Sequence, residues 1–309
     1  MTWFARGADR RAIAHHYDLS NDFYALFLDR RMVYTCAWYR APDVDLDTAQ
    51  EDKLELVCRK LDLRPGARLL DVGCGWGGLL LWAARHHGVE GVGVTLSVAQ
   101  AAFAEEAIRR EGLERRLRVV LADWRSLPPA AADFDAVAAV GLLEHVGIAA
   151  TPLLLATTWR CLRPGGRLLV QAISRDVRWR PTSLQRFLDR HVFPRGELQA
   201  ISTLAGEVER ARFALLDVEG LGEHYARTTR QWAERLRARA DEARALVGER
   251  TYRVWLAYLV SASVAFAQGS IGLYQTLATK PAGADAARSP RTRAAWYAPT
   301  PLPPLERAG

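Results

Sequence analysis

Several features are scarce or missing in this chain of 309 residues. Its four cysteines form no C-x-x-C pair, which argues against a zinc site or a disulfide framework and is typical of a protein in a reducing cytoplasm. No run of about eighteen uncharged apolar residues occurs, and residues 1–20 contain no apolar segment suited to a signal peptide. We therefore expect a soluble, cytoplasmic protein without a metal site.

Lysine is also scarce, and arginine carries almost all of the positive charge. The net charge is +7 and the isoelectric point is near 9.5. Such a balance suits nucleic acid, an anionic membrane surface or an acidic ligand, and it is also produced by genome base composition. No nucleic-acid-binding motif with interleaved aromatic residues is present, so we expect no nucleic-acid partner.

The stretch ARLLDVGCGWGG, residues 67–78, is the strongest local signal. Arg68 to Val72 is typical of a short buried strand that includes the acid Asp71. Glycines follow at Gly73, Gly75, Gly77 and Gly78, and an apolar helix begins after them. In an α/β sheet, such a turn lets a ligand approach the backbone and the free N–H groups of the helix N-terminus. The spacing is G-x-G-x-G, which differs from the dinucleotide pattern G-x-G-x-x-G. We interpret it as a small-molecule site, with a plain tight turn as the alternative.

Strands and helices alternate on both sides of this stretch. The pattern predicts a doubly wound, parallel α/β sheet with helices on both faces. Ligands of such sheets bind at the carboxyl ends of the strands, where Gly73, Thr95, Asp123 and Glu144 all fall. The predicted strands are 68–72, 89–95, 117–121, 135–140 and 167–173, and the predicted helices are 46–61, 79–84, 98–110 and 151–161.

The flanking regions divide the chain. We expect residues 1–60 to form a helical N-terminal lid, with a helix over 2–27, and residues 61–280 to form the main domain. The pattern becomes irregular after residue 173, so we expect an inserted region over about 174–250, with a charged helix over 229–250. An apolar segment over 254–266 and a late strand over 271–279 follow. Residues 281–309 are rich in Pro, Ala and Arg and we expect them to be disordered.

A family resemblance rests on motifs spread over residues 14–280. They read HYDLSNDFY, YTCAWY, LDVGCGWGG, GVTLSVAQ, ADWR, EHVG, FPRGEL and HYARTTRQW. With these motifs the chain resembles the cyclopropane-fatty-acid synthases, a family of S-adenosylmethionine-dependent methyltransferases that includes the mycolic-acid cyclopropane synthases. The resemblance implies a class I methyltransferase fold, related to the Rossmann fold. It also implies methyl or methylene transfer from S-adenosylmethionine to the double bond of an unsaturated acyl chain.

The resemblance also implies a set of cofactor contacts. Asp71 is expected to steer the cationic ammonium group of the cofactor, or alternatively to cap the glycine turn. Aromatic residues are expected to face the sulfonium or the adenine, because a π face attracts a cation. The complete set that we expect to bind the cofactor is Tyr34, Thr35, Asp71, Gly73, Gly75, Gly77, Thr95, Gln100, Asp123 and Trp124.

The catalytic residues implied by the resemblance are Glu144, Tyr225, Cys36 and the residue at position 171. In the family, a bound bicarbonate is thought to take the proton whose loss closes the ring, and these residues, with the backbone at Ile173, surround it. Cys36 has a plain packing role as its alternative. His145 is read as either structural or functional.

The chain departs from the family pattern at two of these positions. Gln171 replaces a histidine, and Ala262 replaces a cysteine, for which Ser261 or Ser263 is a possible substitute. A glutamine amide donates a hydrogen bond to an anion but does not carry a proton. The resemblance therefore leaves open whether bicarbonate binds and whether the product is cyclopropanated or methyl-branched.

Three functions remain open at this point, and the least favoured is a non-catalytic cofactor-binding or regulatory relative, against which the presence of Glu144 and Tyr225 argues. The first is modification of an unsaturated acyl lipid, with peripheral contact between the basic surface and the inner face of an anionic membrane. The second is C-, N- or O-methylation of a specialised metabolite, a small hydrophobic acceptor, on the same fold, because a fold does not determine its acceptor.

Overall fold

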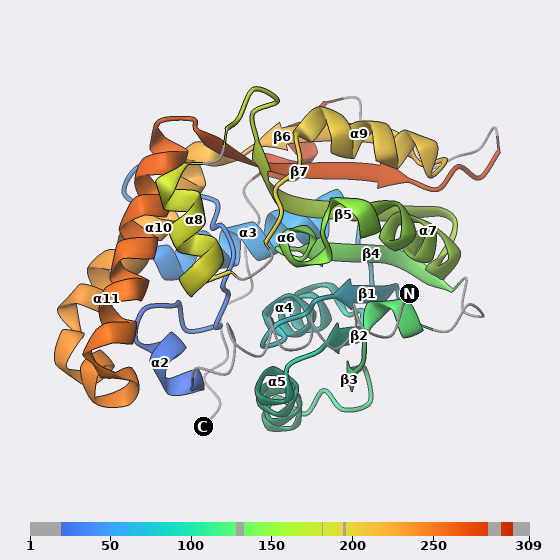
Figure 1. Cartoon of the computed structure of the whole chain (residues 1–309). Helices are drawn as coiled ribbons and strands as arrows, with labels where there is room; N and C mark the ends of the chain where they lie inside the picture. Colours follow the sequence, from blue (N-terminus) through green and yellow to red (C-terminus); the bar gives the residue numbers. More distant parts are fainter. Residues whose placement is uncertain (1–19, 128–132, 181, 194–195, 284–291, 299–309) are drawn as a thin grey trace.

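The computed structural model describes residues 20–127, 133–180, 182–193, 196–283 and 292–298. Its centre is a seven-stranded sheet in the order β3-β2-β1-β4-β5-β7-β6 (Figure 1). The first five strands along the chain pair in parallel, and β7 runs antiparallel to both β5 and β6. The strands are β1 Arg68–Val72, β2 Glu90–Thr95, β3 Leu117–Leu121, β4 Phe134–Val140, β5 Leu162–Arg175, β6 Ala214–Gly220 and β7 Ile271–Thr279.

Helices cover both faces of this sheet and build a further layer beside it (Figure 1). Their bounds are α2 Asn21–Ala25, α3 Leu46–Lys60, α4 Gly78–His87, α5 Val98–Arg110, α6 Leu143–Val146, α7 Thr151–Cys161, α8 Ser183–His191, α9 Ile201–Arg210, α10 Gly222–Ala238, α11 Ala240–Ala267 and α12 Ala294–Tyr297. Within the described part of the chain, none of them is long and apolar enough to cross a bilayer.

The side chains of the central strands point alternately to the two faces of the sheet, which explains why a separate hydrophobic core lies on each face. Leu69 of β1 packs into the core beneath α3, α4 and α5, whereas its neighbour Leu70 packs into the core beneath α7 and α9. Ala136 and Val137 of β4 divide in the same way, as the two-residue repeat of a strand requires. The strands therefore read as continuous apolar runs, because both faces of the sheet are buried.

A third, aromatic-rich core joins α2, α10 and α11 beside the sheet. Trp232 and Tyr24 are wholly buried in it, and the ring of Trp255 meets that of Phe23 edge to face, with centroids 5.4 Å apart. Figure 1 shows α8, α10 and α11 as one layer at the carboxyl-end side of the sheet. This layer faces the glycine turn across the N-terminal segment that follows α2.

Local chemistry fixes several helix ends. The carboxylate of Asp45 accepts the N–H of Thr48 and starts α3, and Ser97 starts α5 by accepting the N–H of Gln100. Gly88 ends α4 in the left-handed conformation. Gly248, at φ 77° and ψ 162°, kinks α11. The kink separates a charged first part from the apolar part that packs beside the sheet.

Most predicted elements are confirmed. The bounds of β1, β3, α5 and α7 agree with the prediction to the residue, and β2, β4 and α3 differ by one residue at one end. The strand expected over 167–173 is longer in the structure, since β5 spans Leu162–Arg175, and its register with β4 is irregular between Phe134 and Ala136. The helix expected over 2–27 falls largely outside the described residues, and α2 is its described part.

Three expectations require correction. The sheet is mixed, because β7 returns antiparallel between β5 and β6. The region after residue 173 is regular, with α8, α9, β6 and α10, and the charged helix over 229–250 is divided by a break at Arg239. Within the segment expected to be disordered, α12 places the buried Trp296 against α3, where Arg59 donates to the Trp296 carbonyl.

Candidate functional site: two pockets that meet at the strand ends

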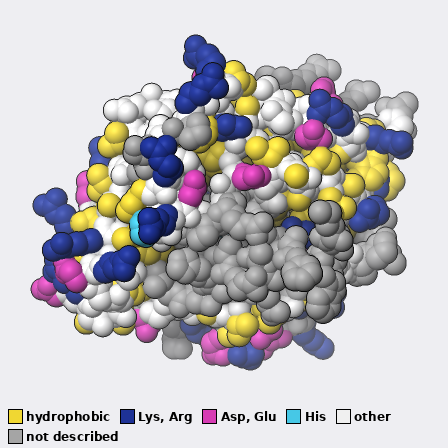
Figure 2. Space-filling model, viewed as in Figure 1, with side chains coloured by type: hydrophobic (Ala, Val, Ile, Leu, Met, Phe, Trp, Pro, Cys, Tyr) yellow, Lys and Arg dark blue, Asp and Glu magenta, His cyan; other side chains and the backbone are white. Residues whose placement is uncertain are grey.

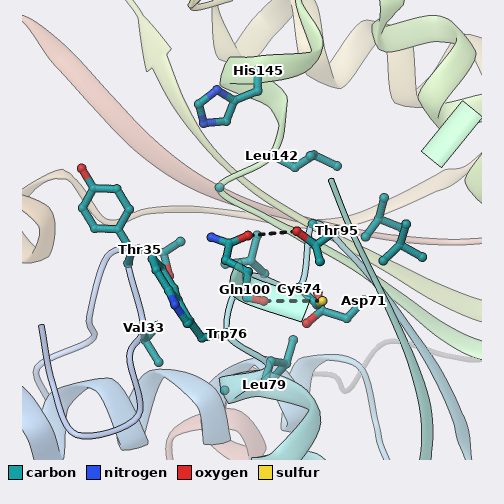
Figure 3. A pocket seen from close by; sticks show the side chains of 18 of the residues that line it. Val33, Thr35, Asp71, Cys74, Trp76, Leu79, Thr95, Gln100, Leu142 and His145 are labelled. Carbon is teal, nitrogen blue, oxygen red and sulfur yellow. Dashed lines mark hydrogen bonds between the residues drawn. The ribbon is translucent and has the colours of Figure 1, made fainter. Parts of the chain in front are cut away.

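A first pocket lies at the carboxyl ends of β1, β2 and β4, and we call it the glycine-loop pocket (Figure 3). Its wall comes from the glycine turn, the start of α5 and the segment before α3. Eight of the residues predicted to bind the cofactor line it: Tyr34, Thr35, Asp71, Gly73, Gly75, Thr95, Gln100 and Trp124. The parallel strands thus bring together residues that are far apart in the sequence, as strand ends at a switch point do.

The glycine turn leaves open space next to its backbone. Gly73 and Gly75 have φ values of +80° and +54°, a region that residues with a side chain rarely adopt. A Cβ atom at Gly73 would lie 3.0 Å from the side chain of Leu142, whereas one at Gly75 would meet no atom within 4 Å. The N–H groups of Gly73 and Cys74 are both bonded to the carbonyl of Val94, which ties the turn to β2.

Two predicted residues, Gly77 and Asp123, do not line the glycine-loop pocket as the structure describes it. Gly77 has φ +84° and precedes α4, and a Cβ there would lie 3.0 Å from the Cβ of Ala104. It therefore lets α4 and α5 approach. The carboxylate of Asp123 accepts the N–H of Arg125 at 2.9 Å and pairs with its guanidinium, so it is engaged in holding the turn that presents Trp124.

The polar floor of the glycine-loop pocket includes a buried acid and a buried base. Burial raises the pKa of Asp71 to about 7, and the nearby Lys53 ammonium opposes that shift. Burial lowers the pKa of Lys53 to about 8. Lys53 also donates to Thr35 Oγ1 at 3.1 Å. The sequence reasoning missed Lys53, although its place on the buried face of a predicted helix is a signal that was available.

The segment from Val33 to Tyr39 closes over the pocket and is held at both ends. Gln50 of α3 donates to the carbonyls of Val33 and Thr35. On the other side, the Tyr39 N–H donates to His224 Nδ1 at 3.0 Å. This bond joins the segment from Val33 to Tyr39 to α10, which carries the motif HYARTTRQW. The helix α10 therefore helps to hold this segment in place beside the glycine turn.

The motif HYDLSNDFY also reaches the glycine turn. Asn21 Oδ1 accepts the indole N–H of Trp76 at 2.8 Å, and the Trp76 ring lies 4.9 Å from that of Tyr24. Trp76 is buried and lines the glycine-loop pocket. It was not among the predicted site residues.

A second pocket lies between β5, α8, α10 and α11 and encloses about 480 Å³, and we call it the apolar pocket. Its volume is in the range of small-molecule sites. Glu144, Gln171 and Tyr225 line it, as do Ile173 and Ala262. Of the described residues in its wall, Glu144 is the only carboxylic acid, and none is Lys or Arg.

Glu144 is held at the inner end of the apolar pocket. Its Oε1 accepts the N–H of Ile173 at 2.7 Å. Its Oε2 is buried and has no hydrogen-bond partner within the described residues. Burial raises the pKa of Glu144 to about 7, against the effect of the Ile173 N–H. Burial of the Tyr258 hydroxyl, with a smaller contribution from the Glu144 charge, raises the pKa of Tyr258 to about 12.

Gln171 is also buried in the wall of the apolar pocket, at 1% exposure. Its Oε1 accepts from Gln275 Nε2 at 2.9 Å, and its own Nε2 has no partner within the described residues. The apolar pocket thus contains one acceptor, on Glu144, and one donor, on Gln171, that no described residue satisfies. Buried polar groups without partners are rare and call for an explanation.

The structure does not bring Cys36 to either pocket, judged by the described residues that line them. The thiol is fully buried, with Sγ 3.8 Å from the carbonyl of Leu221, and burial raises its pKa. Of the two serines near Ala262, Ser261 lines the apolar pocket. Ser263 instead donates to the Ala226 carbonyl at 2.9 Å.

The two pockets share one wall. Tyr34, Thr35, Gly141 and His145 line both of them. Tyr34 donates to the hydroxyl of Tyr258 at 3.1 Å, and burial lowers the pKa of His145 to about 4. Figure 3 shows the His145 ring above the Thr95–Gln100 pair, near Leu142. A ligand in one pocket is therefore adjacent to a ligand in the other.

Comparison with known proteins settles the family. The model of the mycolic acid cyclopropane synthetase family matches residues 5–276. The chain belongs to this family. A probable fatty acid methyltransferase of Pseudomonas putida is 43% identical over 276 residues, which are 88% of this chain and 70% of that protein. The cyclopropane-fatty-acyl-phospholipid synthase of Escherichia coli K12 is 36% identical over 262 residues, 85% of this chain and 66% of that protein.

The solved structures of the family agree. The mycolic acid cyclopropane synthase CmaA1, complexed with SAH and CTAB, superposes with a TM-score of 0.83 at 32% identity, over 88% of this chain and 98% of that one. The chain is therefore an S-adenosylmethionine-dependent methyltransferase with the class I fold. It spans just under two thirds of the length of the Escherichia coli synthase.

Proposed function

We propose that this enzyme transfers a methyl or methylene group from S-adenosylmethionine to the double bond of an unsaturated fatty acyl chain. The observation that carries the proposal is the shared wall of Tyr34, Thr35, Gly141 and His145. It joins a pocket built for a polar cofactor to one whose wall is apolar except for a few placed polar groups. The relatives named above as fatty acid methyltransferase and cyclopropane synthases support this acceptor class.

The glycine-loop pocket fits S-adenosylmethionine. The open backbone at Gly75 gives room for the methionyl part, and Asp71 is a buried acid that favours an ammonium group nearby. Thr95 and Gln100 are joined by a 2.9 Å hydrogen bond and, with Trp124, form the side for ribose and adenine. When bound, the cofactor supplies an electrophilic methyl group on a sulfonium. Tyr34 and Trp76 offer π faces that suit this cation.

The apolar pocket fits the acyl chain. An alkene is a weak nucleophile, so the enzyme must hold it in line with the methyl group and exclude water. The apolar side chains that line this pocket can hold an acyl chain and keep water away from it; they include Leu188, Phe193, Phe266 and Leu273. Attack on the methyl group leaves a positive charge on the second alkene carbon. The rings of Tyr34, Tyr225 and Tyr258 and the carboxylate of Glu144 are the groups that can stabilise it.

The unsatisfied atoms of Glu144 and Gln171 fit a bicarbonate ion between them. Glu144 Oε2 is left to accept a hydrogen bond and Gln171 Nε2 is left to donate one, which is the pair of partners that an anion with one hydroxyl group needs. When bound, bicarbonate supplies the base that accepts a proton from the transferred methyl group. Glu144, Gln171 and Tyr225 would surround the ion, and Ser261 stands beside Ala262. We leave Cys36 out of this set because its thiol is bonded elsewhere.

We further propose that the apolar pocket receives its substrate from an anionic lipid surface. Val260 and Val264 line this pocket and are each 48% exposed, and Val177 is 75% exposed on the segment before α8. Arg178, on that segment, is paired with Asp176, and α8 adds Arg186 and Arg190. Figure 2 shows dark blue and yellow side chains interspersed over this side of the molecule. Such a surface is attracted to anionic headgroups.

One experiment tests the lipid function against the alternative acceptor. Methyl-labelled S-adenosylmethionine is incubated with the enzyme and one of three acceptors, which are anionic vesicles of unsaturated phospholipid, neutral vesicles of the same chains, or a phospholipid-free pool of small cellular metabolites. We expect label in the fatty acids of the vesicles, and more of it in anionic than in neutral vesicles at low salt. Label in the small-molecule pool alone would instead show a methyltransferase of specialised metabolites.

A further inference from the structure

A row of polar side chains crosses three strands beneath the apolar pocket. Gln171 of β5 lies opposite Gln275 of β7, and Gln275 lies opposite Glu219 of β6. Residues that are directly opposite in antiparallel strands place their side chains on the same face. Lys60, in the last turn of α3, reaches the same row and is fully buried.

The row is connected by hydrogen bonds with a defined direction. Lys60 Nζ donates to Gln275 Oε1 at 2.8 Å, and Gln275 Nε2 donates to Gln171 Oε1 at 2.9 Å. At the outer end, Lys60 also pairs with Glu219, and its Nζ lies 3.8 Å from Asp217. Tyr297 of α12 donates to Glu219, and Arg293 pairs with Asp217.

The direction follows from the chemistry of the ammonium group. An ammonium donates hydrogen bonds and accepts none, whereas an amide has a donor end and an acceptor end of nearly equal shape. Lys60 therefore requires the oxygen end of Gln275, which turns the N–H end of Gln275 toward Gln171. Gln171 must then present its own oxygen to Gln275. Its Nε2 is left as the polar atom for the apolar pocket.

We propose that Lys60 is a positioning residue that acts through Gln275 to hold Gln171 with its N–H donor available to the apolar pocket. The inference rests on the proposed function, because it supposes that this pocket takes an anion between Gln171 and Glu144. Without Lys60, both amides can turn over, and Gln171 would present an oxygen near the Glu144 carboxylate. An anion between two acceptors is repelled.

The choice of lysine supports this role. The chain has three lysines, at positions 53, 60 and 280, in a sequence that otherwise uses arginine for positive charge. Burying an ammonium group is costly unless it is paired. Apolar residues would fill the space between α3 and the sheet without this cost. A compact ammonium has the donor-only chemistry that orders the row, and Glu219 and Asp217 compensate its charge.

Four variants separate the orientation of the two glutamine amides from the charge balance around Lys60 and from general packing. Lys60→Met removes the donor. Gln275→Glu keeps the shape and the pairing with Lys60, but its carboxylate has no donor for Gln171, so Gln171 must turn its Nε2 away from the pocket. Glu219→Gln is the control for charge, because Lys60 still donates to Gln275. Lys280→Met is the matched control for loss of a lysine, since Lys280 donates to the carbonyls of Trp159 and Leu162, outside the row.

The measurement is the dissociation constant of sodium bicarbonate, obtained by calorimetry on the full chain saturated with S-adenosylhomocysteine. We expect Lys60→Met and Gln275→Glu to weaken bicarbonate binding at least about tenfold, because a charge-assisted hydrogen bond is lost. Glu219→Gln and Lys280→Met should bind within about twofold of the parent. Binding of S-adenosylhomocysteine should be unchanged in all four variants, which also reports that each variant is folded.

The outcomes are separable from those of the proposed function. Parent-like bicarbonate binding by folded Gln275→Glu would overturn the positioning role, even if Lys60→Met failed to fold. Absence of bicarbonate binding by the parent would also overturn it, since no anion would then meet Gln171. Methyl transfer to lipid, measured separately, decides the proposed function in either case.

Discussion

Glu144 Oε1 lies 2.7 Å from the backbone nitrogen of Ile173 and accepts its hydrogen bond. This bond fixes the short helix α6, at the end of β4, to the neighbouring strand β5. It occupies one carboxylate oxygen and leaves the other, buried and without a described partner, in the apolar pocket. The carboxylate that we place in catalysis is thus oriented by the backbone of the sheet.

The first prediction concerns the pH dependence of methyl transfer. Burial raises the pKa of Glu144 to about 7, and the ionised form is the one that accepts a hydrogen bond and stabilises positive charge. At a fixed concentration of bicarbonate ion, we expect kcat to rise with pH through about 7. Glu144→Gln should lower kcat by about 100-fold or more and remove this rise, with little change in the dissociation constant of S-adenosylmethionine. A rise of the same shape in the variant would assign it to another group.

The second prediction concerns stability. Glu144 has a pKa of about 7 when folded, above its ordinary value of 4.5. The unfolded chain therefore releases this proton first, and the folded state loses stability relative to it as the pH rises from 4.5 to 7. At pH 8, Glu144→Gln should be more stable than the parent by on the order of 1–3 kcal/mol. Near pH 4.5 the difference should vanish. Denaturant unfolding at both pH values checks this, and a less stable variant at pH 8 would contradict it.

The third prediction compares two glycines with the same backbone requirement. Gly75 and Gly66 both have positive φ and open space where a Cβ would point, but only Gly75 lines the glycine-loop pocket. Each change to Ala should cost about 1 kcal/mol of folding stability. Gly75→Ala should also weaken S-adenosylmethionine binding by about tenfold or more, because the Cβ takes space from the ligand, whereas Gly66→Ala should not. Equal affinities, measured by calorimetry, would place the cofactor elsewhere.

The fourth prediction concerns the replacement of a family histidine by Gln171. A neutral imidazole has one acceptor nitrogen and one N–H donor, so it can accept from Gln275 and still donate into the apolar pocket. Gln171→His should therefore keep activity within about threefold, whereas Gln171→Leu should lose about tenfold or more in affinity for bicarbonate. Steady-state rates at varied bicarbonate distinguish the two. If Gln171→Leu behaves like the parent, the Nε2 donor has no part in the reaction.

The sequence predicted what local pattern determines. The strands around Asp71 and the helices of the first half carry apolar periodicity, so the bounds of β1, β2, β3, β4, α5 and α7 were predicted within one residue, whereas α4 extends to His87 and not to residue 84. In contrast, β6 is half-exposed along its length and lacks a buried run, which is why its region read as irregular.

Gly73, Thr95 and Glu144 line the two pockets, where their places after strand ends put them, and the family resemblance named Tyr34, Thr35 and Gln100, which line them as well. Lys53 and Trp76, whose places depend on distant partners, were not predicted. Lys53 donates to Thr35 and Trp76 donates to Asn21, and a local pattern encodes neither contact. Gln171 was named by the family resemblance, but its hydrogen bond with Gln275 was not foreseen. Asp123 and Gly77 were assigned to the cofactor on position alone. The structure shows that one is bonded to Arg125 and that the other permits close packing of helices.

The most direct test of the account is the structure of the product. The enzyme is incubated with methyl-labelled S-adenosylmethionine, bicarbonate and vesicles of an anionic phospholipid with cis-unsaturated chains, and the released fatty acids are analysed by mass before and after mild hydrogenation. We predict a gain of one methylene group in a product that takes up no hydrogen, which identifies a cyclopropane ring and shows that Gln171 serves in place of histidine. A labelled product that takes up hydrogen would contradict ring closure, and the absence of label in the acyl chains would contradict the lipid function itself.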